Sequence, residues 1–368
     1  MSLPVARVSI AGVSIARVSF TTLLVCATLT ACSTPPGQPV SGHAPAAEAA
    51  VPAWVFPLSA PTRAAPTSAM MPTTTAPVAA TTPAAATAPD TIKFIHLPNS
   101  TAGFTRAQLS NRFAAPDWYP TSHAPMPEVV ARGRVPDLYA CGYCHTPGGQ
   151  GRPENAALAG LPSEYIVQQV MDFKSGARRA LLPGVFPPAD LMIHEAMQTT
   201  SDETRIAAEY FSRETLHPRV IVLERSRVPR TQVVGSVYTP IANGGEEPLG
   251  TRLIELARDG EQHENRDDQM RYVAYVPPGS IARGRALART GDHGRTVACV
   301  TCHGKKLQGM AAIPPLAGRS PSYLLRQLLA FQTGARSGPA TQPMQPVVAN
   351  LDISNLIDVI AFAASLPP

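Results

Sequence analysis

The stretch YACGYCHTPGGQGRP, from Tyr139 to Pro153, sets two cysteines three positions apart and places a histidine directly after the second. The stretch VACVTCHGKKLQGM, from Val297 to Met310, repeats this Cys-x-x-Cys-His pattern. A shift of 158 residues superposes the two patterns without a gap, and 14 of the 38 positions from Cys141 to Arg178 are then identical. One structural module therefore occurs twice in the chain.

Each copy of the module is predicted to be helical. Apolar side chains follow Ser163 and Ser322 at the spacing of one helix face. Gly176 and Gly334 fall where these helices are expected to end in a left-handed cap. A second helical pattern closes each copy, and Asp352 is expected to cap the later one. The modules are therefore expected to be small and all-α.

Three kinds of chemistry use a pair of cysteines at this spacing. Covalent haem attachment needs both thiols for thioether bonds and the adjacent histidine as an iron ligand. A thiol-disulfide switch expects a surrounding α/β pattern, which the sequence does not show. Zinc needs four ligands, but the two cysteine pairs lie far apart, and zinc has no use for a histidine at that position. The pattern therefore favours two covalently bound haem c groups.

With these motifs, the two modules resemble class I c-type cytochromes, and their tandem order is similar to dihaem cytochromes of the c4 and c553 kind. The resemblance covers most of residues 116–368. It implies an all-α fold with two tandem cytochrome domains. It also implies the haem-binding residues, which are Cys141, Cys144 and His145 in the first copy and Cys299, Cys302 and His303 in the second.

The same resemblance implies a methionine as the second axial ligand of each iron. Met344 precedes the last helix, as the family's ligand does. In the first copy, Met192 matches best in its distance to the closing helix, while Met197 and His194 remain alternatives. An open sixth position would instead give an iron that binds small molecules.

Two further positions carry expectations from the family. Pro314 matches the proline whose carbonyl accepts a hydrogen bond from the axial histidine, but the first copy has Ala156 in register. That bond must then come from a backbone without a proline ring, or from elsewhere. Arg178 and Arg336 are expected either to pair with haem propionates or to act as cations at a helix end.

The first quarter of the chain is predicted to contain a targeting signal and a tether. Residues 1–31 carry two arginines and an apolar run of about a dozen residues, which predicts a signal peptide rather than a membrane span. The run ends in LTAC, which resembles a bacterial lipobox and makes Cys32 the expected lipidation site; an ordinary secreted protein is the alternative. Residues 32–90 are rich in Ala, Pro and Thr and are predicted to form a disordered tether.

The remaining chain divides into three parts. Residues 116–213 and 279–368 are the predicted cytochrome domains, and residues 214–278 connect them. This connecting segment contains short runs rich in Val and Ile, so we expect short strands in it. Gly284 lies where the family packs its first helix closely against its last. Five histidines have no partner pattern and are expected at the surface: His96, His123, His217, His263 and His293.

Charge and composition argue against a nucleic-acid role. The chain has 31 basic and 26 acidic residues, and the basic ones form no cluster.

We expect an electron carrier rather than an enzyme, on the periplasmic side and anchored by lipid, with the residue after Cys32 favouring the outer membrane. Its partners would be a donor dehydrogenase or quinol-oxidising complex and a terminal acceptor. The alternatives are a dihaem enzyme that resembles peroxidases or thiosulfate dehydrogenases, or a cytochrome subunit of a dehydrogenase complex.

Overall fold

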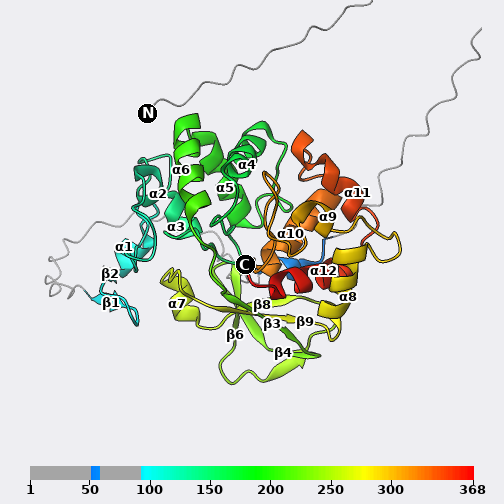
Figure 1. Cartoon of the computed structure of the whole chain (residues 1–368). Helices are drawn as coiled ribbons and strands as arrows, with labels where there is room; N and C mark the ends of the chain where they lie inside the picture. Colours follow the sequence, from blue (N-terminus) through cyan, green and yellow to red (C-terminus); the bar gives the residue numbers. More distant parts are fainter. Residues whose placement is uncertain (1–50, 59–92) are drawn as a thin grey trace, which may run out of the picture. The chain divides into compact units, whose positions relative to one another are not determined.

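The computed structural model describes residues 51–58 and 93–368, and all of them belong to one structural unit (Figure 1). The predicted signal peptide and Cys32 lie outside the described residues, as does most of the predicted tether. Within the described ranges no single helix is long and apolar enough to cross a membrane, although the bent pair Pro339–Val348 and Ile353–Ser365 would be by length and composition.

The first module is a group of helices around one apolar core. Its helices are α2 (Glu128–Ala131), α3 (Cys141–His145), α4 (Ser163–Ser175), α5 (Pro187–Gln198) and α6 (Ser201–Arg213). The predicted helix end at Gly176 is confirmed, because this residue caps α4 with a φ of 76°. The core joins Val130 and Leu138 to Ile166 of α4 and to Phe211 of α6. This packing fixes α3, and with it the first cysteine motif, against α4 and α6.

The second module repeats this plan. Its elements are α8 (Ser280–Thr290), α9 (Val300–His303), α10 (Pro321–Gln332), the 3-10 helix η2 (Pro339–Met344), α11 (Gln345–Val348) and α12 (Ile353–Ser365). Asp352 caps α12 by accepting a hydrogen bond from the amide of Asn355, as predicted. Gly334 has a φ of 70° just after α10, so this predicted left-handed cap is also confirmed.

Close packing of α8 against α12 depends on Gly284. A Cβ atom at this position would lie 1.8 Å from the carbonyl oxygen of Asp358, so only a glycine allows the approach. The carboxylate of Asp358 is buried and accepts hydrogen bonds from Arg283 Nε and Nη2 at 2.7 and 2.9 Å. The predicted close approach of the first and last helices is therefore confirmed.

The connecting segment forms more than isolated strands. Its strands are β3 (Val220–Glu224), β4 (Arg227–Pro229), β5 (Thr231–Val234), β6 (Val237–Pro240), β7 (Glu246–Pro248), β8 (Ile254–Ala257) and β9 (Tyr272–Val276), with α7 (Gly260–Glu264) between the last two. Five of them make one mixed sheet in the order β3-β9-β8-β6-β5, and β4 pairs with β7. The sheet lies beside the helices of both modules in Figure 1.

The short strands expected in the runs rich in Val and Ile are present as β3, β8 and β9, but the hairpin of β5 and β6 was not predicted. A two-residue turn, Gly235-Ser236, separates two short runs that contain Val and Thr, and Gly235 has a φ of 62°. A glycine at such a turn between β-branched runs is a hairpin signal that could have found both strands.

The tether predicted over residues 32–90 is wrong for residues 51–58. Here the 3-10 helix η1 (Ala53–Val55) and Phe56 pack into the core of the second module, with Val55 and Phe56 only 4% and 3% exposed. Tyr238 and Arg326 donate hydrogen bonds to the carbonyls of Trp54 and Val55. Three consecutive large apolar side chains outweigh the polar, proline-rich average of the region.

A short segment precedes the first module. Strands β1 (Phe94–His96) and β2 (Gly103–Thr105) pair antiparallel, and the helix α1 (Arg106–Ser110) follows. Trp118 lies under them, 1% exposed, and its indole Nε1 donates to the carbonyl of Asn265 at 2.8 Å. This bond ties the segment to the end of α7 in the connecting segment.

Candidate functional site

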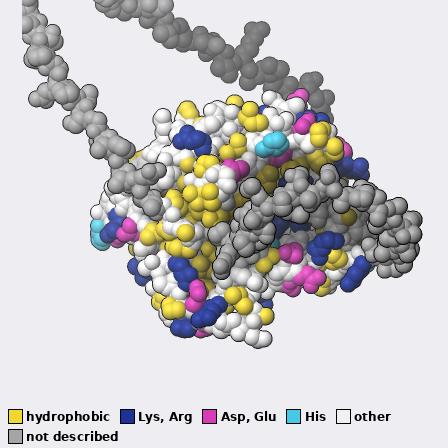
Figure 2. All heavy atoms as spheres, turned by 180° about the vertical axis from the view of Figure 1, so that it is seen from behind, with side chains coloured by type: hydrophobic (Ala, Val, Ile, Leu, Met, Phe, Trp, Pro, Cys, Tyr) yellow, Lys and Arg dark blue, Asp and Glu magenta, His cyan; other side chains and the backbone are white. Residues whose placement is uncertain are grey.

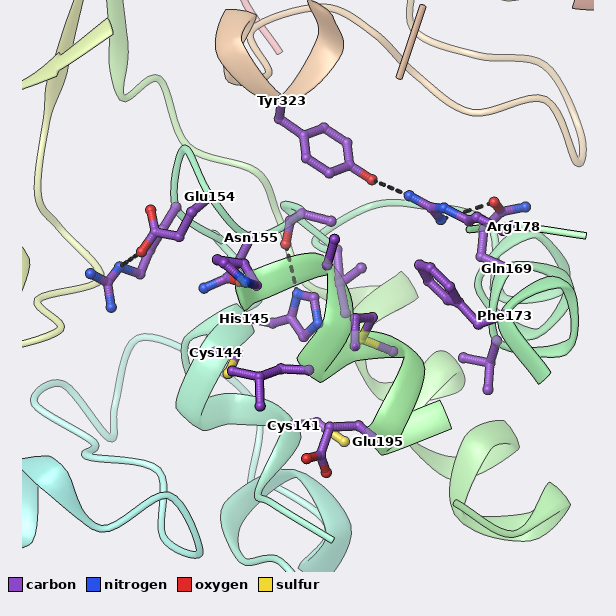
Figure 3. Close-up of a pocket in the computed structure, with 18 of the residues that line it drawn as sticks. Cys141, Cys144, His145, Glu154, Asn155, Gln169, Phe173, Arg178, Glu195 and Tyr323 are labelled. Carbon is purple, nitrogen blue, oxygen red and sulfur yellow. Dashed lines mark hydrogen bonds and ion pairs between the residues drawn. The ribbon is translucent and has the colours of Figure 1, made fainter. Parts of the chain in front are cut away.

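The first motif forms the single helical turn α3, which ends at His145. The His145 ring is placed so that Nδ1 donates a hydrogen bond to the carbonyl oxygen of Ala156 at 2.8 Å (Figure 3). With Nδ1 occupied in this way, Nε2 is left as the free lone pair of the imidazole. Burial lowers the pKa of His145, which keeps the ring neutral and suited to bind a metal ion.

The second motif shows the same local geometry. His303 ends α9, and its Nδ1 donates to the carbonyl oxygen of Pro314 at 2.8 Å. The expected hydrogen bond from the histidine to the Pro314 carbonyl is thus present. In the first copy the bond comes from the backbone of Ala156, which is the first of the two possibilities that the sequence left open.

A cavity of about 450 Å³ opens in front of the first motif. Its wall includes both cysteines and His145, apolar side chains such as Leu161, Ile166 and Phe211, and several arginines. Figure 3 shows Cys141, Cys144 and His145 presenting their side chains to one region, with Phe173 and Arg178 on another part of the wall. The cavity therefore accepts a large, mostly apolar group that has an acidic edge.

The chemistry of the donors fits haem c. Two free thiols stand one helical turn apart, and a neutral imidazole with a free nitrogen lies beside them. The wall also holds Arg336, whose Nε is buried and has no hydrogen-bond partner within the described residues. A haem propionate is an acceptor of the kind that this nitrogen lacks.

The three candidates for the sixth ligand of the first iron differ in exposure. Met192 lies on α5 and lines the cavity. Met197 is on the same helix, but its side chain is 58% exposed, and His194 is also exposed. The residues around Met192 were expected to form a loop, whereas they form the helix α5. In the second copy, Met344 is half-buried at the end of η2.

Arg178 and Arg336, which are equivalent in the repeat, join the two modules. Arg178 donates to Tyr323 Oη at 3.0 Å and to Gln327 Oε1 at 2.8 Å in the second module. Arg336 donates in return to Tyr165 and Gln169 of the first module. Repeated residues therefore make reciprocal contacts between the copies.

The return contacts go to the residues equivalent to Tyr323 and Gln327. Arg336 Nη2 donates to Gln169 Oε1 at 2.7 Å and to Tyr165 Oη at 3.3 Å. Both arginines also line the cavity. They are thus cations of the module interface as well as of the cavity wall, and neither of the two roles expected from sequence included the interface.

The connecting segment supplies cavity residues that sequence reasoning missed. The guanidinium of Arg266 lies 3.5 Å from the ring centroid of Tyr143 and donates to the Tyr143 carbonyl at 2.9 Å. His263, expected at the surface, is buried beside the ion pair of Arg152 with Glu154. Burial lowers the pKa of His263 to about 3, so it stays neutral. No sequence pattern in the connecting segment pointed to these contacts.

Comparison with known proteins gives the family. A thiosulfate dehydrogenase electron acceptor from Thiomonas intermedia (strain K12) is 26% identical over 237 residues, which cover 63% of this chain and 81% of that protein. Cytochrome c-554(548) from Halomonas halodenitrificans is 37% identical over 68 residues, 18% of this chain and 82% of that protein. No protein-family model matches the chain. Reduced cytochrome c4 from Pseudomonas stutzeri, a solved structure, aligns at 20% identity over 61% of this chain and 93% of that one, with a TM-score of 0.41.

The chain belongs to the c-type cytochromes. With two attachment motifs in tandem modules it is a dihaem member with two covalently bound haem c groups, and its role is electron transfer between redox partners. Cytochromes of this kind are periplasmic. The alternative of a dihaem enzyme is not favoured, because the relatives are named as an electron acceptor and as cytochromes.

Proposed function

We propose that this cytochrome takes single electrons from a dehydrogenase that oxidises thiosulfate and passes them to a further acceptor. The observation that supports this donor is the similarity to a protein named as a thiosulfate dehydrogenase electron acceptor, 81% of whose length is covered by the alignment. A second protein of that name, from Stutzerimonas stutzeri (strain A1501), is 40% identical over 79 residues. Both similarities concern the electron-accepting partner of the enzyme, so we assign this chain the carrier role and no reaction of its own.

The proposed site of the first haem is the cavity beside α3. Cys141 and Cys144 would hold the porphyrin by thioether bonds, and His145 and Met192 would ligate the iron. The position of Met192 in the cavity wall, on α5, and the fixed ring of His145 support this assignment. Two protein ligands leave no position for a substrate, which suits a carrier.

The proposed site of the second haem uses the equivalent residues. Cys299 and Cys302 would form the thioether bonds, and His303 and Met344 would be the axial ligands. The hydrogen bond from His303 to Pro314 and the half-buried position of Met344 support this set. Each haem c, when bound, supplies one electron at its iron. The chain's own residues orient that iron and restrict its access to water.

The interface arginines are proposed to serve the acidic edges of the haems. Arg178 and Arg336 are fixed by the amide oxygens of Gln169 and Gln327, which leaves the unpartnered Nε of Arg336 at the cavity wall. A cation at this point would compensate the charge of a partly buried propionate. The two haem domains, residues 116–213 and 279–368, would thus hold the propionate edges of their haems near the shared interface.

Redox partner proteins are proposed to dock on the face opposite to that of Figure 1. Hydrophobic side chains gather in the middle of this face, and basic and acidic side chains are interspersed around them (Figure 2). Such a mixture suits brief docking of redox partners, whose complexes are small and rapidly exchanged.

The donor is tested by following haem absorbance after mixing. The full chain is combined with thiosulfate, with a thiosulfate dehydrogenase, or with both. We expect two electrons per chain to be taken up only when enzyme and thiosulfate are both present. Reduction by thiosulfate alone would make this chain an enzyme, and no reduction in the complete mixture would remove this donor.

The lipid anchor at Cys32 is a separate proposal. It rests on the LTAC sequence that ends the apolar run of the predicted signal peptide. Cys32→Ser is expected to move the cytochrome from the membrane fraction to the soluble periplasm. Cys26→Ser is the matched control, because Cys26 lies inside the segment that is cleaved off, and this variant should stay in the membrane fraction. Equal distribution of both variants would contradict the anchor.

A further inference from the structure

Arg319 lies at the junction of the two modules, just before α10. Its side chain is buried, with 5% of the residue exposed, and within the described residues the hydrogen bonds of its guanidinium all go to backbone carbonyls. Nε donates to the carbonyl of Pro315 at 2.8 Å in its own module. Nη1 and Nη2 donate to the carbonyls of Ala157 and Ala159 in the other module, at 2.6 and 3.0 Å.

Two of these acceptors are equivalent positions of the repeat. Ala157 and Pro315 are 158 residues apart, which is the shift that superposes the modules. Each directly follows the residue whose carbonyl accepts the hydrogen bond from the histidine of its motif, namely Ala156 and Pro314. One guanidinium therefore joins the two histidine-binding loops at matching points.

The two loops differ in how their own sequence fixes them. The loop of the second module contains Pro314 and Pro315, whose rings restrict φ. The first module has Ala156 and Ala157 at these positions, so its backbone is free to rotate. Nevertheless both loops have the same local structure, since the bridge of Arg152 with Asn155 matches that of Met310 with Ile313.

Other buried arginines from outside the first module hold the same loop. Arg219, from the connecting segment, donates to the carbonyl of Gly151 at 2.9 Å, and Arg326, on α10, donates to the carbonyl of Pro153. Both are nearly as buried as Arg319, and in the described part of the chain none of the three forms an ion pair with a carboxylate. Burying such a cation is costly unless hydrogen bonds compensate it. Each of the three arginines donates at least one of its hydrogen bonds to this loop of the first module.

We propose that Arg319 is the positioning residue of the first haem's axial histidine. It holds the Ala157 and Ala159 carbonyls, so that the neighbouring Ala156 carbonyl stays in place to accept the hydrogen bond from His145 Nδ1. It thereby does for the first module what the ring of Pro314 does for the second. This proposal rests on the proposed role of His145 as an iron ligand.

The hydrogen bond at Nδ1 affects how strongly the imidazole donates electrons to a bound metal. Loss of the bond makes His145 a weaker donor, which favours the reduced iron and raises the potential. Changes to such supporting contacts commonly alter metal affinity by 10-fold or more. A tenfold change in the ratio of the two oxidation states corresponds to about 59 mV for one electron.

The test uses Arg319→Met, which keeps the length of the side chain but removes its donors. Each haem is followed by redox titration and by electron paramagnetic resonance of the ferric protein. We expect the potential of the first haem to rise by about 59 mV and its g-values to change. The potential of the second haem should change by only a fraction of that amount. Arg319→Lys keeps the charge but cannot join the two loops, so it should show the same change. It replaces Arg319→Met in the test if that variant fails to fold.

The decisive variant adds Ala156→Pro to Arg319→Met. Proline fits there, because Asn155 is equivalent to Ile313, which precedes Pro314 in the matching bridge, and the Ala156 amide donates no hydrogen bond within the described residues. We expect the ring to restore the potential and the g-values of the first haem. Equal shifts at both haems, no shift at either, or no restoration by proline would overturn the proposal.

The wild-type spectrum separates this proposal from the assignment of His145. Two ferric low-spin signals, one of which is lost in His145→Gln, establish the ligand first. If His145→Gln leaves both signals unchanged, the ligand assignment fails and Arg319 cannot act through it. If that signal is lost but Arg319→Met changes nothing, only the positioning role fails.

Discussion

Gly284→Ala tests the close packing of α8 against α12 by the sign of its effect. In an isolated helix, alanine is more favourable than glycine by about 1 kcal/mol. In this chain the new Cβ would lie 1.8 Å from the Asp358 carbonyl oxygen and 2.4 Å from its carbon. Those are backbone atoms in a helix and cannot rotate away, so the helices must separate.

The expected magnitude follows from these two opposing effects. Overpacking of a rigid core commonly costs about 1–3 kcal/mol and occasionally more, and a contact of this kind with backbone belongs at the upper end. After the gain in helix propensity, we expect Gly284→Ala to lower the free energy of unfolding by about 2 kcal/mol. Separation of α8 and α12 should also loosen the core shared by Leu287 and Ile357.

The assay is guanidinium denaturation of the protein with both haems, monitored by far-ultraviolet circular dichroism. Gly260→Ala is the matched control. Gly260 is also helical, but its added Cβ would meet only Thr239, at an ordinary 3.6 Å. The control should be neutral or slightly stabilising. A stabilised Gly284→Ala variant would refute the close approach.

Three further predictions follow from single side chains. Met192→Ala and Met344→Ala should each abolish the sulfur-to-iron charge-transfer absorption of one haem and lower its potential, and an unchanged band would remove that methionine as a ligand. Phe56→Ala should lower the free energy of unfolding by about 3 kcal/mol, because the ring is 3% exposed in the core, whereas a free tether would show no change. The hydrogen bond to Asp117 raises the pKa of His123 to about 9. The contribution of this pair to the free energy of unfolding is therefore present below about pH 6.5 and is lost as the pH rises through 9. His123→Gln should remove about 1 kcal/mol of that pH dependence in unfolding experiments, and an unchanged profile would contradict the pairing.

The repeated parts of the chain were predictable because their signals are local. The Cys-x-x-Cys-His motifs, the helix ends at Gly176 and Gly334 and the cap at Asp352 each depend on a few neighbouring residues. Tight packing at Gly284 came from the family resemblance, and the structure gives its reason in the carbonyl of Asp358. The motifs, the helix ends and the cap need no knowledge of the rest of the fold.

The contacts between distant parts were not predictable. Arg319 and Arg266 have no motif around them, and their roles depend on which backbone the fold brings beside them. Phe56 lies in a proline-rich region whose average composition hides one apolar cluster. His263 was expected at the surface because nothing near it in sequence indicated burial.

We propose that the two irons of this chain are both fully ligated by protein. The most direct measurement is the absorption spectrum of the purified protein, oxidised and reduced, before and after carbon monoxide. We predict two low-spin haems per chain whose reduced spectrum carbon monoxide leaves unchanged. A spectral shift of either haem would show an accessible iron, and it would contradict the assignment of this cytochrome as an electron carrier.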